Sequence, residues 1–358
     1  MIDDLAELVT CESFSSDLDA VARSAELVGA MGARHLGAEP EFLVIDGVTH
    51  LRWTFGEPRV LLLGHHDTVW PIGTLKTHPW SVVDGVARGP GVFDMKSGLV
   101  QIFHALAGME SLDGVSVLIT GDEEVGSTTS SKLIEESARG LAAAFVLEAS
   151  ADGGALKTGR KGTSDYQVEV YGKAAHAGLE PWNGANAGVE LAHQILAIAE
   201  LGPQVGDGTT VTPTVLSGGS TVNTVPARAR VGVDVRVTTL QAQRQVDELM
   251  RALGTTVPGT RVEVSGGPNR PPLEEAMSAS LFALAQRLSP DPLSSASVGG
   301  ASDGNFTAGV GCPTLDGLGG VGGGAHADHE HVIVAELPRR AALLRALVGA
   351  VLTGTNLT

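Results

Sequence analysis

Cysteine is scarce in this sequence, and its scarcity excludes a disulfide-stapled fold. The 358 residues contain only two cysteines, Cys11 and Cys312. Two thiols cannot form a disulfide framework, and their spacing matches no cysteine metal motif. We therefore expect both to be buried or idle thiols.

Positive charge and long apolar runs are scarce as well. Lys and Arg total 24 against 41 Asp and Glu, which gives a formal net charge of -17. Because phosphate neutralisation needs a clustered excess of Lys and Arg, this balance argues against a nucleic-acid partner. No apolar run approaches the roughly 20 residues needed to span a bilayer. The acidic N-terminal segment also lacks the basic start and apolar core of a signal peptide, so we expect a cytoplasmic protein without a membrane partner.

Three short apolar runs occupy the first half of the chain. They cover residues 60–63, 115–119 and 144–147, and helical patterns are expected over residues 97–109 and near 128–136. Apolar runs of this length between helical stretches are typical of buried strands in a mostly parallel sheet. We therefore predict an α/β fold, and the length leaves room for two or three domains.

The middle of the chain follows a different pattern. Residues 166–171 and 231–237 alternate between apolar and polar, which indicates half-exposed strands of an antiparallel sheet. Helical stretches are expected at 187–201 and 240–253, and a closing strand at 261–264. An order of strand, helix, two strands, helix and strand fits a ferredoxin-like unit. We expect this α+β unit to be an insert over residues 162–269, within a larger domain made of residues 1–161 and 270–358.

Side chains that can bind metal follow each apolar run of the first half. The candidates at the ends of the three runs are His65, His66, Asp67, Asp122, Glu123, Glu124 and Glu148. In open α/β sheets, ligands bind at the carboxyl ends of the strands, where the loops diverge. Asp94 precedes the helix expected from residue 97, and His326 follows the glycine-rich residues 319–324. Three strands that end in this way favour a metal site over unrelated loop residues.

Five ordered motifs make the pattern specific. They lie at residues 64–69, 89–96, 121–126, 172–178 and 324–326 and span nearly the whole chain. With them the sequence resembles the M20 metallopeptidase family, which includes glutamate carboxypeptidase, aminoacylase, acetylornithine deacetylase and succinyl-diaminopimelate desuccinylase. The resemblance implies a hydrolase with two zinc ions per subunit that cleaves an amide bond next to a free amino-acid carboxylate. It also implies a catalytic domain with a mostly parallel sheet and an inserted lid domain that forms a homodimer.

The resemblance assigns five metal ligands. Asp94 is expected to bridge the two ions. His65 and Glu148 complete the ligands of one ion, and the peptide bond after Asp94 is expected to be cis. Glu124 and His326 complete the ligands of the other ion. Each ion then has three protein ligands and an open position for water, as catalytic zinc requires. Imidazole and carboxylate ligands without thiolates suit Zn²⁺ and also Co²⁺ or Mn²⁺.

Two adjacent glutamates, Glu123 and Glu124, are expected to have different roles at this site. Glu124 binds metal, and Glu123 is predicted to be the general base that takes a proton from the attacking water and passes it to the leaving nitrogen. Asp67 resembles the family carboxylate that orients His65 through its other ring nitrogen.

The remaining histidines near the ligands receive lesser roles. The family pattern His-x-Asp makes His66 the variable position, and we expect it to line the pocket. His329 and His331 come after the residue that the motif selects, and they are expected at surface or supporting positions.

The insert carries further residues that the resemblance singles out. In the family, the histidine at the position of His176 reaches the active site of the other subunit and helps to stabilise the tetrahedral oxyanion, which requires a dimer. Asn223 and Arg236 match positions that contact substrate. Asn223 is expected to donate a hydrogen bond, and Arg236 to hold a carboxylate through its planar fork.

Two weaker matches lie outside these motifs. Arg270 resembles the arginine that glutamate carboxypeptidases use for the terminal carboxylate of their substrate. Gly300 belongs to residues 299–303, which resemble a glycine-rich loop of the family that lets the backbone approach the substrate. Asp303 in the same loop is expected to be a turn or cap residue.

Three functions remain open at this point. The leading hypothesis is a glutamate carboxypeptidase-like enzyme that acts on a small peptide or N-acyl amino acid. The second is an N-acyl-amino-acid deacylase of the aminoacylase or acetylornithine deacetylase type. The third is a catalytically inactive relative that only binds a ligand. Such a relative would be expected to lack Glu123 or a metal ligand, and none is missing here.

Overall fold

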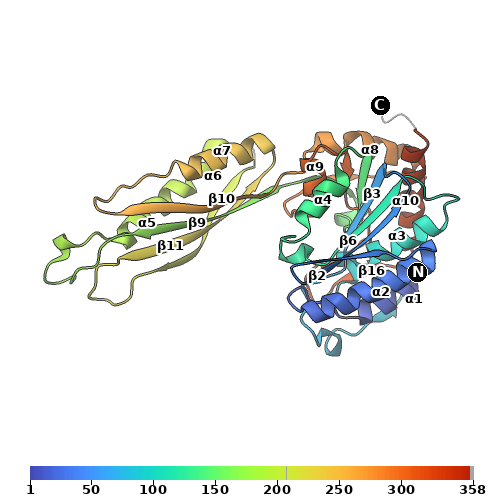
Figure 1. The fold of residues 1–358 in the computed structure, drawn as a ribbon, viewed down its shortest axis with the longest axis horizontal. Coiled ribbons are helices and arrows are strands. Elements are labelled where there is room, and N and C mark those ends of the chain that lie inside the picture. Colours follow the sequence, from blue (N-terminus) through green and yellow to red (C-terminus); the bar gives the residue numbers. More distant parts are fainter. Residues whose placement is uncertain (207, 355–358) are drawn as a thin grey trace. The chain divides into compact units, whose positions relative to one another are not determined.

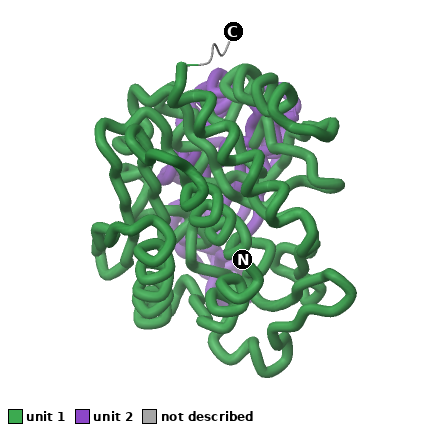
Figure 2. The backbone as a smooth tube through the Cα atoms, turned by 90° about the vertical axis from the view of Figure 1, so that its right-hand side faces the viewer, with its two compact units in different colours: residues 1–160, 273–358 green, residues 161–272 purple. Residues whose placement is uncertain are grey.

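The chain forms two compact units in the computed structural model, which describes residues 1–206 and 208–354. Unit 1 consists of Met1–Arg160 and Leu273–Thr358, and unit 2 of Lys161–Pro272 (Figure 2). Unit 2 begins one residue earlier and ends three residues later than the insert expected from the sequence. In the described residues, no helix is both long and apolar enough to cross a membrane.

A six-stranded sheet forms the centre of unit 1. Its strand order is β1-β2-β6-β3-β7-β14. The bounds are β1 Glu41–Ile45, β2 Val48–Phe55, β3 Val60–His65, β6 Val115–Thr120, β7 Ala143–Val146 and β14 Thr314–Leu315. β3 pairs in parallel with β6 and β7, β7 pairs in parallel with β14, and β1 and β2 add an antiparallel edge. The three apolar runs of the sequence are thus the three neighbouring central strands, and the sheet is mainly parallel as predicted.

Helices cover both faces of this sheet (Figure 1). Leu62 packs in one core with residues of α2 (Leu18–Leu36), α3 (Ser97–Ala107) and α10 (Glu336–Leu352). Its neighbours Leu61 and Leu63 pack in a second core with α4 (Ser131–Ala138) and α9 (Gly304–Gly309). Successive strand side chains point to opposite faces, so a continuous apolar run is what a sheet buried on both sides requires. Burying each leucine stabilises the fold by about 1.5–3 kcal/mol.

The remaining elements of unit 1 surround this sheet. They are α1 Ile2–Thr10, η1 Thr74–Lys76, β4 Ser81–Val83, β5 Val86–Arg88, η2 Val92–Lys96, η3 Glu123–Val125, η4 Asp152–Gly154, β8 Leu156–Arg160, α8 Glu275–Leu288, β13 Ser295–Val298, β15 Gly322–Gly323 and β16 His331–Ile333. β13 and β8 form a two-stranded sheet, and β15, β16, β5 and β4 form a four-stranded one.

Unit 2 has the predicted order of strand, helix, two strands, helix and strand. Its strands are β9 Gly162–Tyr171, β10 Thr210–Gly218, β11 Arg228–Val237 and β12 Arg261–Arg270. Its helices are η5 Pro181–Asn183, α5 Ala187–Ala199, α6 Leu201–Val205 and α7 Leu240–Arg251. The sheet order is β10-β11-β9-β12, and every pair is antiparallel. Val231 and Val235 are buried while Asp234 between them is half-buried, which is the alternation that the sequence predicted.

Two predicted boundaries were wrong for local reasons. The helix predicted near residue 128 begins at Ser131, because the backbone N–H and hydroxyl of Thr129 and the hydroxyl of Ser130 donate to Asp122. These bonds hold the chain in a turn before the helix. The closing strand extends to Arg270, past two glycines and a proline that are poor strand formers. Its pairing with β9, which has a register shift beside Pro268, overrides that preference.

Candidate metal centre

The central strands deliver three acidic or imidazole side chains to one edge of the main sheet. His65 is the last residue of β3, Glu123 begins η3 just after β6, and Glu148 follows β7. Because these strands are neighbours and parallel, their carboxyl ends lie side by side. A nitrogen or oxygen atom from each of the three side chains lies within 4.8 Å of the others.

Asp94 links this group to a second one. Its Oδ1 atom lies 3.4 Å from Nε2 of His65, which is itself 3.5 Å from Oε1 of Glu148. Its Oδ2 atom lies 3.3 Å from Nε2 of His326, which is 3.2 Å from Oε2 of Glu124. The two oxygens of one carboxylate therefore face two different clusters. The Asp94–Met95 peptide is cis, as expected.

These separations fit metal ligands better than direct hydrogen bonds. Two ligand atoms about 2.0–2.2 Å from a tetrahedral ion lie about 3.3–3.6 Å from each other. Direct N–H···O bonds cluster at about 2.9–3.0 Å. In the described structure Nε2 of His65, Oδ1 of Asp94 and Oε1 of Glu124 are buried without a hydrogen-bond partner. Buried polar atoms are seldom left in this way, so the donor set fits a pair of divalent cations.

The electrostatics of the cluster indicate the same need for positive charge. Asp94 and Glu124 raise the pKa of His326 to about 10. Burial opposes protonation of His65, but the carboxylates of Asp67, Asp94 and Glu148 raise the pKa of His65 well above its usual value. In both cases the surrounding carboxylates favour a positive charge at this position.

The glycine-rich segment before His326 is a packed loop and not a linker. A Cβ atom at Gly319 would lie 2.2 Å from the carbonyl oxygen of Leu147, and one at Gly322 would lie 1.9 Å from that of His331. The N–H of Gly319 donates to the carbonyl of Glu148. Glycine is therefore required for this loop to run beside the end of β7 and bring His326 to the cluster.

Comparison with known proteins identifies the family. The family model for "Peptidase family M20/M25/M40" matches residues 61–350. The chain belongs to this family. The M20-family chain is 29% identical to carboxypeptidase G2 of Pseudomonas sp. (strain RS-16), over 97% of this chain and 88% of that one. It is 26% identical to a succinyl-diaminopimelate desuccinylase of Wolinella succinogenes, over 81% of this chain and 82% of that one.

Solved structures share the fold of this M20-family hydrolase. An M20 family metallo-carboxypeptidase of Sulfolobus solfataricus superposes with a TM-score of 0.74 over 98% of both chains, at 15% identity. The agreement extends over both units of the chain, and a mixed α/β architecture with a mainly parallel sheet is thus common to the two proteins.

Asp67 connects the segment of His65 to the segment of Glu123 and Glu124 in the M20-family site. Its backbone carbonyl accepts a hydrogen bond from Nδ1 of His65 at 3.0 Å, and its Oδ1 atom lies 3.3 Å from the same nitrogen. Its carboxylate also accepts the N–H groups of Glu123 and Glu124 and the hydroxyl of Ser15. Asp67 therefore fixes the orientation of His65 and the position of the Glu123–Glu124 turn together.

Arg160 is a buried site residue that the sequence analysis missed. Its Nη2 atom lies 3.6 Å from Oε2 of Glu148, and its Nε donates to Asp316 at 2.6 Å. Its Nη1 donates to the carbonyl of Gly300, so the same guanidinium also contacts the predicted substrate loop. Although burial favours the neutral form, Asp316 and Glu148 raise the pKa of Arg160. No local signal marks Arg160, because it ends a short segment of mixed character, Leu156–Arg160, that matches none of the motifs.

Glu330 is the second residue that was missed. Its carboxylate accepts backbone N–H groups from Gly91, Phe93 and Asp94 at 2.9, 2.9 and 3.0 Å and the indole N–H of Trp70 at 2.7 Å. It therefore holds the turn that presents Asp94. It lies between His329 and His331 in the sequence, outside the motif that ends at His326, and no local pattern marks it.

We expect the Glu330→Gln substitution to weaken metal binding by about 10- to 100-fold, as loss of supporting carboxylates does elsewhere. Both carboxylate oxygens face two N–H donors, so the amide nitrogen of glutamine must oppose donors in either orientation. Affinity is measured by competition with a chromophoric chelator. The exposed Glu110→Gln serves as a matched control. Equal affinities in the two variants would contradict this role for Glu330.

The structure corrects the prediction for His66. This side chain is 0% exposed and does not line an open pocket. Its Nε2 atom is 3.1 Å from the carbonyl oxygen of Thr49, and burial lowers the pKa of His66 to about 4. It is a neutral core residue, because alternation along the strand points it away from the edge that His65 faces.

Other polar residues near the cluster have structural contacts. Asp303 is buried and accepts the hydroxyl groups of Thr120 and Ser127. It therefore ties its loop to the end of β6, in line with the structural role expected for it. His329 is exposed and His331 half-buried, and neither belongs to the ligand cluster. Cys11 and Cys312 are free thiols.

Unit 2 brings His176 and Asn223 together. The N–H of Ala177 donates to the carbonyl of Asn223, and His176 forms a β-bridge with Thr224. Nδ1 of the exposed His176 accepts the N–H groups of Gly178 and Leu179 at 3.2 and 3.1 Å. In the neutral ring the proton therefore lies on Nε2, which becomes a hydrogen-bond donor.

Arg236 and Arg270 lie at the opposite end of the same sheet. Both are paired with Thr163 in the strand register, whereas Arg228 of β11 is opposite Tyr171 at the other end of β9. Thr163 and Tyr171 are eight positions apart in β9, which corresponds to roughly 26 Å along the strand. The side chain of Arg236 pairs with Asp234 at 2.8 Å. Backbone pairing continues beyond the Tyr171 end to His176 and Asn223, so one copy of unit 2 cannot place these two residues and both arginines on one small molecule.

Proposed function

We propose that the cluster holds two divalent cations, zinc first and Co²⁺ or Mn²⁺ as alternatives, with Asp94 between them. His65 and Glu148 are the remaining protein ligands of one ion. Glu124 and His326 are those of the other. The observation that carries this proposal is the division of the Asp94 oxygens between two imidazoles, at 3.4 and 3.3 Å. When bound, such ions polarise a carbonyl and lower the pKa of water towards neutrality.

We propose that Glu123 moves the proton in hydrolysis of the amide bond. It is 8% exposed, next to the cluster, and its N–H is fixed by Asp67. From there its carboxylate accepts a proton from the attacking water and passes it to the leaving nitrogen, which departs as an amine. The presence of Glu123 and all five ligands argues against an inactive, ligand-binding relative. Fewer than about one metal equivalent per chain after metal loading would contradict the two-ion site.

The substrate that we propose is a peptide or N-acyl compound with a free carboxylate next to the scissile amide. Carboxypeptidase G2 and a succinyl-diaminopimelate desuccinylase are both relatives, so a carboxypeptidase and an enzyme that removes an acyl group are both represented among similar proteins. Arg236 and Arg270 supply guanidinium groups that bind carboxylates in a planar fork. The cytoplasmic location expected from the sequence stays a prediction.

A substrate panel tests this proposal and separates its two forms. We expect kcat/KM to be about 10- to 100-fold higher for substrates with a free α-carboxylate than for the same substrates as α-carboxamides, since charged hydrogen bonds are the stronger ones. A carboxypeptidase prefers folyl-type glutamates and dipeptides, and a deacylase prefers N-acetyl or N-succinyl amino acids. Equal cleavage of acids and carboxamides would refute carboxylate recognition.

We propose that the chain works as a homodimer in which His176 serves the site of the partner subunit. The separation within unit 2 supports this, because a second copy can supply His176 and Asn223 where the first supplies Arg236 and Arg270. The Nε2–H of His176 is then the donor to the developing oxyanion.

Mixing two inactive variants tests the dimer. In a hybrid of His176→Ala and Glu123→Gln subunits, one site has Glu123 from the first chain and His176 from the second. Random exchange in an equal mixture should restore about a quarter of the wild-type activity, since half of the dimers are hybrids with one competent site. Activity no higher than that of the two separate variants would show that His176 acts within its own chain or not at all.

A further inference from the structure

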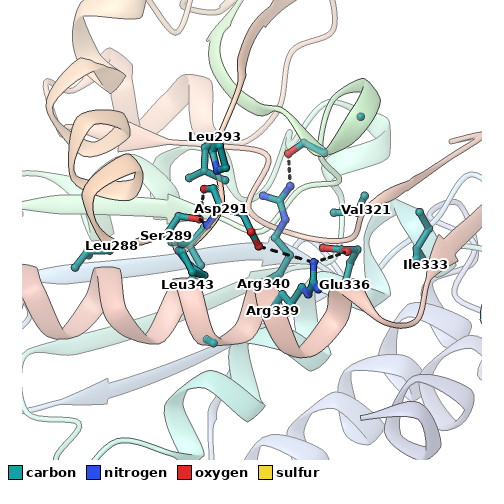
Figure 3. Close-up of a pocket in the computed structure, with 15 residues that line it drawn as sticks. Leu288, Ser289, Asp291, Leu293, Val321, Ile333, Glu336, Arg339, Arg340 and Leu343 are labelled. Carbon is teal, nitrogen blue, oxygen red and sulfur yellow. Dashed lines mark hydrogen bonds and ion pairs between the residues drawn. The ribbon is translucent and has the colours of Figure 1, made fainter.

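A cavity of about 710 Å³ lies in unit 1 between η4, the loop after α8 and the start of α10 (Figure 3). Its walls include Leu288, Leu293, Val321, Ile333 and Leu343. This volume lies within the range of small-molecule sites, which are mostly apolar with a few placed polar groups. None of the proposed metal ligands lines it.

The polar group of this cavity is Arg340, which extends from α10 in Figure 3. Its side chain is 6% exposed, and its Nη2 atom donates to the carbonyl of Gly154. Its Nη1 atom is buried and has no hydrogen-bond partner among the described residues. Burial lowers the pKa of Arg340, and Glu336 only partly offsets this. A buried guanidinium with a missing acceptor is costly unless an anion or another acceptor completes it.

The acidic residues at the rim do not complete it. Asp291 and Glu336 lie 3.9 and 3.4 Å from Nη1 of the exposed Arg339, and dashed lines mark these pairs in Figure 3. Asp291 is itself largely exposed, so solvent screens its charge. The atom without a hydrogen-bond partner is therefore Nη1 of Arg340 in the cavity wall, whereas the ion pairs at the rim belong to Arg339.

The walls of the cavity also touch the two loops that lead from the metal cluster. Gly154 follows Glu148 in one loop, and Val321 precedes His326 in the other. The loops are joined by hydrogen bonds from the N–H of Ser150 to the carbonyl of Gly320 and from the N–H of Gly319 to the carbonyl of Glu148. A molecule bound against Gly154 and Val321 would thus contact the two loops whose backbone positions Glu148 and His326.

We propose that this cavity is an effector site for a small carboxylate with an apolar body, whose carboxylate pairs with Arg340 and whose body lies against the leucine, valine and isoleucine side chains. When it is bound there, it reduces local opening of the loops that carry Glu148 and His326. The binding is independent of the proposed function, and the effect on the loops rests on the proposed metal cluster.

Binding is tested on the metal-loaded enzyme with 4-methylpentanoate as the probe, by calorimetry. We expect Arg340→Met to weaken binding at least roughly tenfold, because a buried charged hydrogen bond is lost. Arg339→Met, which removes the same charge at the exposed rim, should change it less than about twofold. The uncharged 4-methylpentan-1-ol should bind much more weakly. Equal binding of acid and alcohol, or equal behaviour of the two variants, would overturn the proposal.

Two further measurements guard against a misfolded variant and against binding at the metal cluster. Ala342→Trp fills the cavity from an exposed position of α10 and should abolish binding without touching Arg340. Anomalous diffraction from 5-bromopentanoate should place bromine between α10 and the loop after α8. Bromine found only at the metal cluster, or unchanged affinity in Ala342→Trp, would refute the site.

The effect on the loops has its own readout. Amide hydrogen exchange at residues 148–155 and 319–326 should slow when 4-methylpentanoate is added to the wild type and stay unchanged in Arg340→Met. This readout does not depend on turnover, so it stands even if the proposed substrate is wrong. Binding without any change in exchange would overturn the effector role.

Discussion

Replacing Glu123 with glutamine is expected to lower kcat by about 10²- to 10⁴-fold, the usual contribution of a positioned general base. Glutamine has the same shape and fills the same buried position, but its amide cannot accept a proton from water. The backbone N–H that binds Asp67 is unchanged, so the turn that carries Glu124 should keep its place. Steady-state rates and metal content, measured on the same preparation, give the result.

The neighbouring glutamate supplies the matched control. Glu124→Gln alters a proposed ligand and should lower both the metal content and the rate, whereas Glu123→Gln should lower the rate alone. The adjacent positions thus separate proton transfer from metal binding. A Glu123→Gln enzyme with wild-type kcat would refute the proposed mechanism, and one that loses metal would make Glu123 a ligand instead.

The site could be predicted from sequence where a local pattern marks a place in the fold. An apolar run predicts a buried strand, and parallel strands deliver their last residues to one edge, so His65, Glu123 and Glu148 could be grouped from strand ends alone. The pairing of β3 with β6 and β7 confirms that these ends are neighbours. Asp94 and His326 follow no central strand, and only the resemblance of their motifs could connect them to this edge.

The supporting residues could not be predicted, because their roles depend on contacts between distant segments. Glu330 binds the N–H of Asp94 across a sequence separation of 236 residues, and Arg160 reaches Asp316 across 156. No periodicity or spacing encodes such contacts. His66 was misjudged for a related reason. Its sequence neighbours His65 and Asp67 lie at the cluster, but strand geometry turns His66 into the core, where it contacts Thr49.

In the fold, too, local patterns predicted some elements, whereas others depend on contacts between distant segments. Alternation predicted β9 and β11 of unit 2, because each has one buried and one exposed face. β10 could be expected only from the order of elements, since its residues are mostly exposed and show little alternation. It is held by antiparallel pairing with β11, a contact that lies outside its own sequence.

Replacing Asp94 with asparagine is expected to remove both metals. Asparagine keeps the size of the side chain, but it has one carbonyl oxygen where the carboxylate offers a charged oxygen to each cluster. The metal content should fall from about two equivalents to less than one, and the rate should fall at least as far as in Glu123→Gln. Asp122→Asn is the control. Asp122 is buried and accepts hydrogen bonds from Thr129 and Ser130, so its substitution removes a carboxylate that is not a proposed ligand.

Stability gives this prediction a second, independent readout. A cation that binds only the folded state stabilises it by about 4.1 kcal/mol at a free concentration 1,000 times its Kd. Wild-type protein should therefore melt at a clearly lower temperature in chelator than with metal. The Asp94→Asn protein should melt at nearly the same temperature in both, because it no longer has the carboxylate that faces both clusters. A variant that still gains stability from metal as the wild type does would show that Asp94 does not join the two clusters.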